Sequence, residues 1–120
     1  LGAAVATLLA LDLAANAGVA DLALYTFASP RAGSHAFAAA VNAHVTTSWR
    51  VVNAPDVVPK VPPLYAHVEA EYLVDSNLHD LPHSLVTYHR MATYLALLAP
   101  GVAAADANLA SPPAREASVR

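Results

Sequence analysis

Residues 48–63 read Ser-Trp-Arg-Val-Val-Asn-Ala-Pro-Asp-Val-Val-Pro-Lys-Val-Pro-Pro. The first part, Ser48 to Asn53, contains β-preferring residues and predicts a short buried strand. Four prolines follow it and predict an irregular, stiff loop, because proline fixes φ and removes a backbone donor. Asp56 stands in this loop just after the strand. Because loops at the carboxyl ends of parallel strands carry ligand-binding and catalytic groups, Asp56 is a candidate functional residue.

Alternating helix and strand patterns flank this segment on both sides. The predicted elements are a helix over 1–16 that ends at Gly18, a strand over 22–27, a helix from Ser34 to about residue 44, the strand over 48–53, a strand over 65–74 and a helix over 82–99. Helices and strands that alternate in this way indicate an α/β fold, namely the second half of a doubly wound parallel sheet.

Composition narrows the class of protein. The chain has 120 residues, of which 57% are hydrophobic and 12% charged, so it can build one core. Its net charge of −3 offers no basic surface for a phosphate backbone, so nucleic acid is not an expected partner. No apolar stretch is long enough for a transmembrane segment. With no cysteine there is no thiol nucleophile, and both a cytoplasmic and a secreted location stay open.

The chain divides into two parts by composition. Residues 1–100 carry all of the predicted elements and are expected to form one partial domain. Residues 101–120 are rich in Ala, Ser and Pro and are expected to form a mobile tail. At the other end, the helix begins at Leu1 without a capping residue, and a free ammonium there would oppose the helix dipole. We therefore expect the full-length protein to continue upstream of Leu1.

Several segments resemble the class 3 lipases, the fungal-lipase-like branch of the α/β-hydrolases. Leu1-Gly2-Ala3-Ala4 is similar to the second half of the nucleophile elbow Gly-His-Ser-Leu-Gly. Residues 24–33, Leu-Tyr-Thr-Phe-Ala-Ser-Pro-Arg-Ala-Gly, resemble the family's Tyr-Thr-Phe-Gly-Ser-Pro-Arg-Val-Gly, with alanine in place of Gly at Ala28 and of Val at Ala32. Residues 50–63 resemble the segment that carries the catalytic aspartate, and residues 65–68, Tyr-Ala-His-Val, resemble the Tyr-x-His-Val that follows it. Residues 83–88 resemble the His-x-Leu-x-x-Tyr that holds the catalytic histidine.

The resemblance implies a fold, a reaction and a set of site residues. The fold is the C-terminal half of an α/β-hydrolase sheet with flanking helices, an incomplete domain. The full-length protein would be a lipase that hydrolyses carboxylic esters of acyl lipids, at a lipid–water interface, through a Ser-Asp-His catalytic triad and an acyl-enzyme. Asp56 and His83 would be catalytic, the serine would directly precede Leu1, and the backbone N–H of Leu1 would serve the oxyanion hole. Without that serine, the chain by itself is expected to be inactive.

Other interpretations remain open beside this one. The fold could serve as a non-catalytic binding or scaffold module, or the reaction could be that of a feruloyl or cutin-type esterase. His79 and His89 compete with His83 for the role of the base. His79 and His83 also have the spacing of a helical metal pair, but Pro82 opposes a continuous helix and no third ligand is evident. No metal and no cofactor are therefore expected.

Polar and aromatic residues outside the triad have simpler explanations. Most are predicted to support the structure rather than the chemistry: His67 as a structural histidine, Arg31 as a donor to loop carbonyls, and Tyr88 and Tyr94 as core residues.

Overall fold

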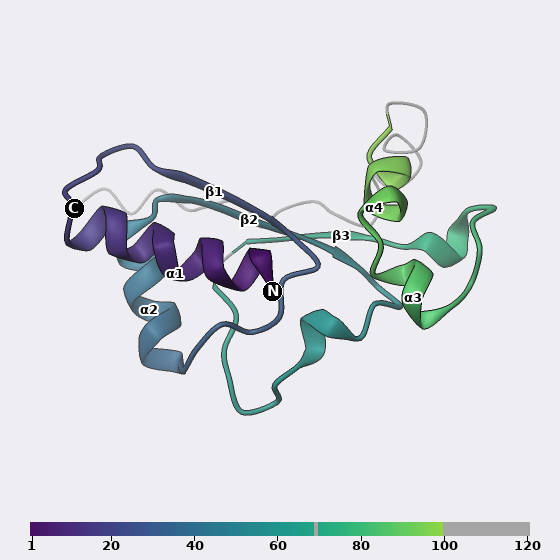
Figure 1. The fold of residues 1–120 in the computed structure, drawn as a ribbon, viewed down its shortest axis with the longest axis horizontal. Coiled ribbons are helices and arrows are strands. Elements are labelled where there is room, and N and C mark those ends of the chain that lie inside the picture. The colour runs from purple at the N-terminus through teal and green to yellow at the C-terminus, as the bar shows by residue number, and fades with distance from the viewer. Residues whose placement is uncertain (69, 100–120) are drawn as a thin grey trace, which may run out of the picture.

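The computed structural model describes residues 1–68 and 70–99 (Figure 1). The elements in chain order are α1 (Gly2–Ala15), β1 (Ala23–Phe27), α2 (His35–His44), β2 (Thr47–Asn53), the short 3₁₀ turn η1 (Val58–Lys60), β3 (Glu71–Val74), a second 3₁₀ turn η2 (Ser76–Leu78), α3 (Leu85–Tyr88) and α4 (Met91–Leu97). The segment 101–120, expected to be a mobile tail, lies outside the described residues.

The strands form a three-stranded parallel sheet in the order β1-β2-β3. All three run in the same direction, with their carboxyl ends toward α3 and α4 (Figure 1). Thr26 of β1 pairs with Arg50 of β2, and Val51 of β2 pairs with Tyr72 of β3. The predicted α/β class with a parallel sheet is confirmed, and the loops that follow the strands meet at one edge.

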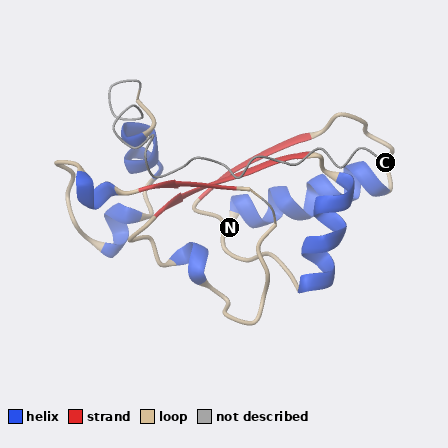
Figure 2. Ribbon diagram, turned by 180° about the vertical axis from the view of Figure 1, so that it is seen from behind, coloured by secondary structure: helices blue, strands red, loops and turns tan. Residues whose placement is uncertain are grey.

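Helices pack on both faces of the sheet. On one face, Ala10 of α1 and Val41 of α2 join Leu24 of β1 in a buried cluster. On the other face, Tyr94 and Leu97 of α4 pack with buried residues that include Val51 and Val74. Successive side chains of a strand point to opposite faces, which is why β1 contributes Leu24 to the first cluster and Phe27 to the second. Figure 2 shows α1 and α2 together on one side and the short helices at the carboxyl ends of the strands.

The first four predicted elements are confirmed to within about a residue or two, the usual uncertainty of element ends. Ser34 caps α2 as expected, since its hydroxyl accepts from the N–H of Phe37 at 3.3 Å. Gly18 has φ +66°, the left-handed conformation expected where the chain leaves α1. Apolar runs and, for α2, a capping hydroxyl are local features of the sequence, and these elements depend on them.

The predicted strand over 65–74 is wrong in its first half, because β3 begins only at Glu71. The N–H of Ala66 donates to the carbonyl of Gly33 at 2.8 Å in an isolated antiparallel bridge, so this segment is paired away from β2. Ala70 has φ +24°, which is not a strand conformation and delays the start of β3. The proline-rich loop was expected to lack regular structure, yet it contains the single turn η1.

The predicted helix over 82–99 is also wrong as a single element. It is two helices, α3 and α4, and residues 82–84 precede the first of them. Ser84 caps α3, because its hydroxyl accepts from the N–H of Thr87 at 3.1 Å. Arg90 is extended, with ψ 138°, and this breaks the helix directly after His89. The break leaves His89 at a bend of the chain, where its ring can turn toward the ends of the strands.

Among the helices of residues 1–68 and 70–99, none combines the length and apolar character that a membrane span requires.

Candidate active site

Asp56 is held rigidly in the loop after β2. Its residue exposure is 1%, and its backbone N–H donates to the carbonyl of Asn53 at 2.9 Å. The carboxylate oxygen Oδ1 accepts from the backbone N–H of Val58 at 3.0 Å, which closes an Asx turn over Val57. A buried carboxylate needs several donors to offset the loss of hydration, and this turn supplies the first.

The other carboxylate oxygen of Asp56, Oδ2, receives two side chains. The hydroxyl of Tyr94 donates to it at 2.7 Å, and Nδ1 of His89 lies 2.9 Å from it. The side chain of Asp56 is fully buried, whereas that of His89 is 40% exposed. One side of the His89 ring therefore contacts a buried carboxylate, and its other side is open. A carboxylate orients an imidazole that acts as a base in this arrangement.

His83, the histidine of the sequence motif, lies among other partners. Its Nδ1 is 3.1 Å from Oδ1 of Asn77 and 3.3 Å from the hydroxyl of Tyr88, and its residue is exposed. The structure therefore brings together Asp56 and His89, and it does not join His83 to Asp56 by a hydrogen bond. The role of His83 as the base stays a prediction. Among residues 1–68 and 70–99, no three His, Cys, Asp or Glu side chains are grouped so that they could hold a metal ion.

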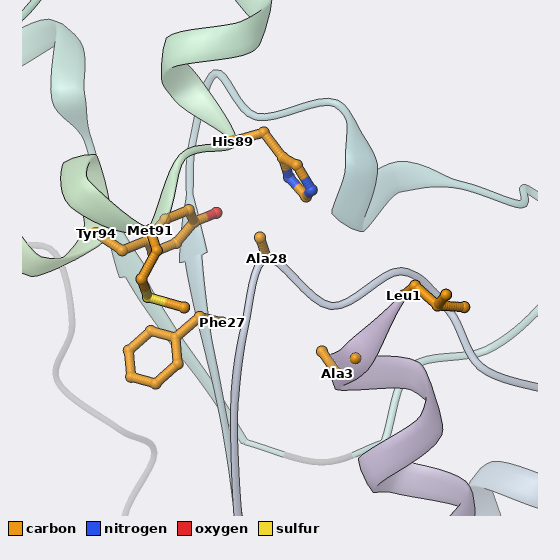
Figure 3. Close-up of a pocket in the computed structure, with 8 residues that line it drawn as sticks. Leu1, Ala3, Phe27, Ala28, His89, Met91 and Tyr94 are labelled. Atoms are coloured by element: carbon orange, nitrogen blue, oxygen red, sulfur yellow. The ribbon is translucent and has the colours of Figure 1, made fainter.

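A pocket of about 240 Å³ lies beside His89 (Figure 3). It is lined by Leu1, Gly2, Ala3, Phe27, Ala28, His89, Met91 and Tyr94. The imidazole of His89 points into the space between Ala28 and the amino-terminal end of α1 (Figure 3). Leu1, whose backbone N–H was predicted to serve an oxyanion hole, thus lies on the same pocket as His89. The carboxyl end of β1, the amino-terminal end of α1 and the bend before α4 meet at this pocket.

Most of the side chains that line the pocket are apolar, and its two polar side chains are those of His89 and Tyr94. Burial raises the pKa of the Tyr94 hydroxyl far above its usual value, and the Asp56 carboxylate adds to the rise, although the backbone N–H of Asn53 that donates to the hydroxyl opposes it. Tyr94 is therefore a neutral donor at ordinary pH. The prediction that Tyr94 belongs to the core is confirmed, but its hydroxyl also contacts the candidate dyad.

Ala28 occupies an unusual backbone conformation at the rim of this pocket. Its φ of +52° is in the left-handed region, which glycine adopts without steric cost and which other residues adopt rarely. The family motif has glycine at the position of Ala28. The methyl group of Ala28 therefore adds a side chain to the pocket wall at some conformational cost.

Sequence reasoning placed His89 second to His83 and did not assign the Tyr94 hydroxyl a role. One signal for Tyr94 was available, because a buried aspartate requires donors and a tyrosine in a core helix is one of the few side chains that can supply one. The position of His89 depends on the bend at Arg90, for which the sequence contains no proline or glycine signal.

The two structural roles predicted for His67 and Arg31 are confirmed. Nε2 of His67 lies 2.6 Å from the carbonyl of Pro59, and Nη1 of Arg31 donates to the carbonyls of Pro62 and Pro63 at 3.3 and 3.2 Å. Both side chains thus stabilise the proline-rich loop that follows Asp56 by hydrogen bonds to its carbonyl groups. Burial first and the Arg50 guanidinium second lower the pKa of His67 from its usual 6.5, while its bond to Pro59 acts in the opposite direction.

Stability should consequently depend on the protonation of His67. Because the pKa of His67 is lower in the folded chain, the unfolded chain binds the proton more readily. The contribution of neutral His67 to the stability of the fold is therefore complete above pH 6.5. It is lost as the pH falls toward the pKa of His67 in the folded chain. We expect His67→Gln, whose amide can still donate to Pro59, to reduce the fall in Tm on acidification below pH 6.5. The exposed His35→Gln is the control, and an equal effect of both variants would contradict this explanation.

Comparison with known proteins gives the class of this chain. A parallel α/β fold with a buried carboxylate–imidazole pair beside an apolar pocket is an arrangement typical of hydrolases. The family model described as Lipase (class 3) matches residues 1–66, more than half of the chain. The chain belongs to the class 3 lipase family. The match includes Asp56 and ends before both His83 and His89.

Individual relatives agree with this assignment. A secreted mono- and diacylglycerol lipase A of Penicillium cyclopium is 44% identical over 79 residues, 63% of this chain and 25% of the relative. A secreted mono- and diacylglycerol lipase 1 of Fusarium solani is 36% identical over 88 residues, 71% of this chain and 26% of the relative. A phospholipase A1-II 4 of Oryza sativa subsp. japonica is 37% identical over 104 residues, 79% of this chain and 26% of the relative. The chain thus spans about a quarter of the length of these relatives.

Proposed function

We propose that the full-length protein containing this chain is a serine carboxylic-ester hydrolase that acts on acyl lipids. The chain supplies the acid and the base of the triad, Asp56 and His89, together with one wall of the pocket. The observation that carries the proposal is the 2.9 Å contact between Asp56 Oδ2 and His89 Nδ1, with the imidazole directed into a pocket that the amino-terminal end of α1 also lines.

The nucleophile in this proposal is a serine directly before Leu1, outside residues 1–120. Its support is the resemblance of Leu1-Gly2-Ala3-Ala4 to the nucleophile elbow and the position of α1 at the pocket. His89 Nε2 takes the proton of the serine hydroxyl as the serine oxygen attacks the ester carbonyl. The backbone N–H of Leu1, a peptide amide in the longer protein, stabilises the negative charge that develops on the carbonyl oxygen.

The remaining steps follow from the same groups. The imidazolium of His89 gives its proton to the departing alcohol, and the serine retains the acyl group as an ester. Water then attacks this acyl-enzyme as His89 accepts its proton, and His89 returns that proton to the serine oxygen as the carboxylic acid is released. Asp56 holds the Nδ1–H of His89 throughout and stabilises the imidazolium, while Val58 and Tyr94 keep the carboxylate oriented.

His83 is the second candidate for the base. The motif in residues 83–88 favours it, and an exposed ring can be redirected when further segments of the protein are present. The direct contact between Asp56 and His89 favours His89, and the two assignments predict opposite outcomes for substitution.

The proposal also includes an incomplete sheet. Side chains of Val5, Leu8 and Leu9 on α1 are about half exposed, and β1 is an edge strand in the described sheet. An apolar helix face of this kind is normally covered in a complete domain. The part of the α/β-hydrolase domain encoded upstream would cover it and would extend the sheet beyond β1, and residues 1–120 alone would lack ester hydrolase activity.

The substrate class rests on the relatives and the pocket. The relatives are named as mono- and diacylglycerol lipases and as a phospholipase A1, whose shared substrate feature is the ester of a fatty acid with a glycerol backbone. An apolar pocket beside the base suits an acyl chain delivered from a lipid–water interface.

Covalent labelling tests the proposal. The full-length protein should hydrolyse p-nitrophenyl butyrate and an emulsified diacylglycerol, and an alkyl phosphonate should label the residue before Leu1, as detected by mass spectrometry of the peptide. The chain 1–120 alone should not hydrolyse either ester. Absence of both turnover and adduct would favour a non-catalytic module, while a preference for methyl ferulate would favour the feruloyl-type esterase.

A further inference from the structure

Asn53, the last residue of β2, lies at the centre of a buried hydrogen-bond network. Its residue exposure is 0%, and its backbone N–H donates to the hydroxyl of Tyr94 at 3.0 Å. That hydroxyl donates in turn to Oδ2 of Asp56 at 2.7 Å. A continuous path of hydrogen bonds therefore runs from the backbone of the central strand, through Tyr94, to the carboxylate that contacts His89.

The side chain of Asn53 ties the same strand to the segment that carries His89. Nδ2 donates to the carbonyl of Tyr88 at 3.1 Å and to the hydroxyl of Ser76 at 3.0 Å, and Oδ1 accepts from the N–H of Ser76 at 2.9 Å. Tyr88 directly precedes His89. The backbone next to the imidazole and the hydroxyl that holds the carboxylate are thus fixed by one residue of β2.

We propose that Tyr94, anchored by Asn53, is a positioning residue that sets the orientation of the Asp56 carboxylate toward His89. This rests on the proposed function, in which Asp56 and His89 act together. Tyr94 does not exchange a proton with substrate in this role. It acts through Asp56, and its contribution appears in the chemical step rather than in substrate binding.

The physical reason is the distribution of hydrogen-bond partners between the two carboxylate oxygens of Asp56. Oδ1 is held by the Val58 N–H, and Oδ2 is held by Tyr94 and His89 together. Without the Tyr94 hydroxyl, Oδ2 is tied only to a histidine that is itself 40% exposed, so the carboxylate and the ring can rotate together away from the pocket. The buried N–H of Asn53 also loses its acceptor, which favours a shift of the strand end.

Tyr94→Phe removes this hydroxyl and little else. The ring of Tyr94 packs edge-on against Phe27, with centroids 6.2 Å apart and planes at 82°, and phenylalanine keeps this contact. Tyr72→Phe is the matched control, because Tyr72 packs against the same cluster as Tyr94 and its hydroxyl makes no hydrogen bond to another described residue.

We expect Tyr94→Phe in the full-length protein to lower kcat by about 10-fold to 100-fold, the range that one hydrogen bond to a charged group is worth. KM should stay unchanged, and Tyr72→Phe should leave both parameters as in the wild type. Equal kcat for the two variants, or a rise in KM without a fall in kcat, would overturn the positioning role.

A double-mutant cycle with Asp56→Ala tests whether Tyr94 acts through Asp56. Once the carboxylate is absent, Tyr94→Phe should have no further effect on the residual kcat. Losses that simply multiply would show an independent structural effect and would contradict the proposal.

A spectroscopic measurement separates this proposal from the proposed function. The Nδ1–H proton of His89, hydrogen-bonded to Asp56, should be visible by NMR in the wild type and in Tyr72→Phe, and should be lost to exchange with water in Tyr94→Phe. If Asp56→Ala leaves ester hydrolysis intact, the proposed function fails, whereas an unchanged Nδ1–H signal in Tyr94→Phe means that the positioning role fails.

Discussion

His89→Ala should lower kcat for ester hydrolysis by the full-length protein by a factor on the order of 10⁶, the loss found when the base of a serine hydrolase triad is removed. The serine hydroxyl then has no group that accepts its proton, and the departing alcohol has no donor. Most of the side chains that line the pocket beside His89 are apolar and stay in place, so KM should change far less than kcat. Steady-state kinetics on p-nitrophenyl butyrate and on diacylglycerol emulsions would measure both parameters.

His83→Ala is the matched control for this variant. His83 is exposed and hydrogen-bonded to Asn77 rather than to Asp56, so we expect kcat close to that of the wild type. The reverse result, with activity abolished by His83→Ala and kept in His89→Ala, would identify the histidine of the sequence motif as the base. Equal losses in His79→Ala and His83→Ala that added zinc restores would indicate a metal site instead.

Asp56→Asn should lower kcat by a factor on the order of 10⁴, as in the comparable serine protease substitution. The amide fits the same turn, because its oxygen can still accept from Val58. Its NH₂ group, however, cannot accept from Nδ1–H of His89 and favours the tautomer in which Nε2 carries the proton. An imidazole in that tautomer cannot remove the proton of serine.

The control for Asp56→Asn is Asp21→Asn. Asp21 is exposed and precedes β1, at the opposite end of that strand from the pocket, and asparagine tolerates its φ of +56°. Its kcat should equal that of the wild type. Retention of activity in Asp56→Asn, with the phosphonate adduct still formed, would show that Asp56 is a structural turn residue and not the acid of a triad.

The first half of the fold could be predicted from sequence because local patterns specify it. α1 is apolar on nearly all sides and β1 is a short apolar run, while the cap at Ser34 and the left-handed conformation of Gly18 mark where the chain changes direction. The place of Asp56 just after a buried strand could be predicted because both the strand and the proline-rich loop that follows it are evident in the sequence. These features depend on residues that are close together along the chain.

The second half depends on contacts between distant residues, and there the sequence was a weaker guide. β3 is short because Ala66 pairs with Gly33. The single helix predicted over 82–99 is two helices, in which Leu85 and Leu95 are 66% and 61% exposed while Tyr94 and Leu97 are buried. Which histidine lies next to Asp56 depends on where the chain bends after His89, and Asn53 of β2 holds the carbonyl of Tyr88 directly before that bend.

The acid and the base of the candidate dyad lie in two different parts of the fold, because the bend between α3 and α4 places His89 in a short helical segment. Asp56 lies in the loop anchored at the end of β2, whereas His89 belongs to a short helical segment that reaches the sheet through α4 and the side chain of Asn53. Segments with few buried contacts open locally at a lower free energy than the whole domain unfolds. Detachment of this segment would therefore switch off proton transfer while the sheet stays folded, so thermal inactivation would precede thermal unfolding.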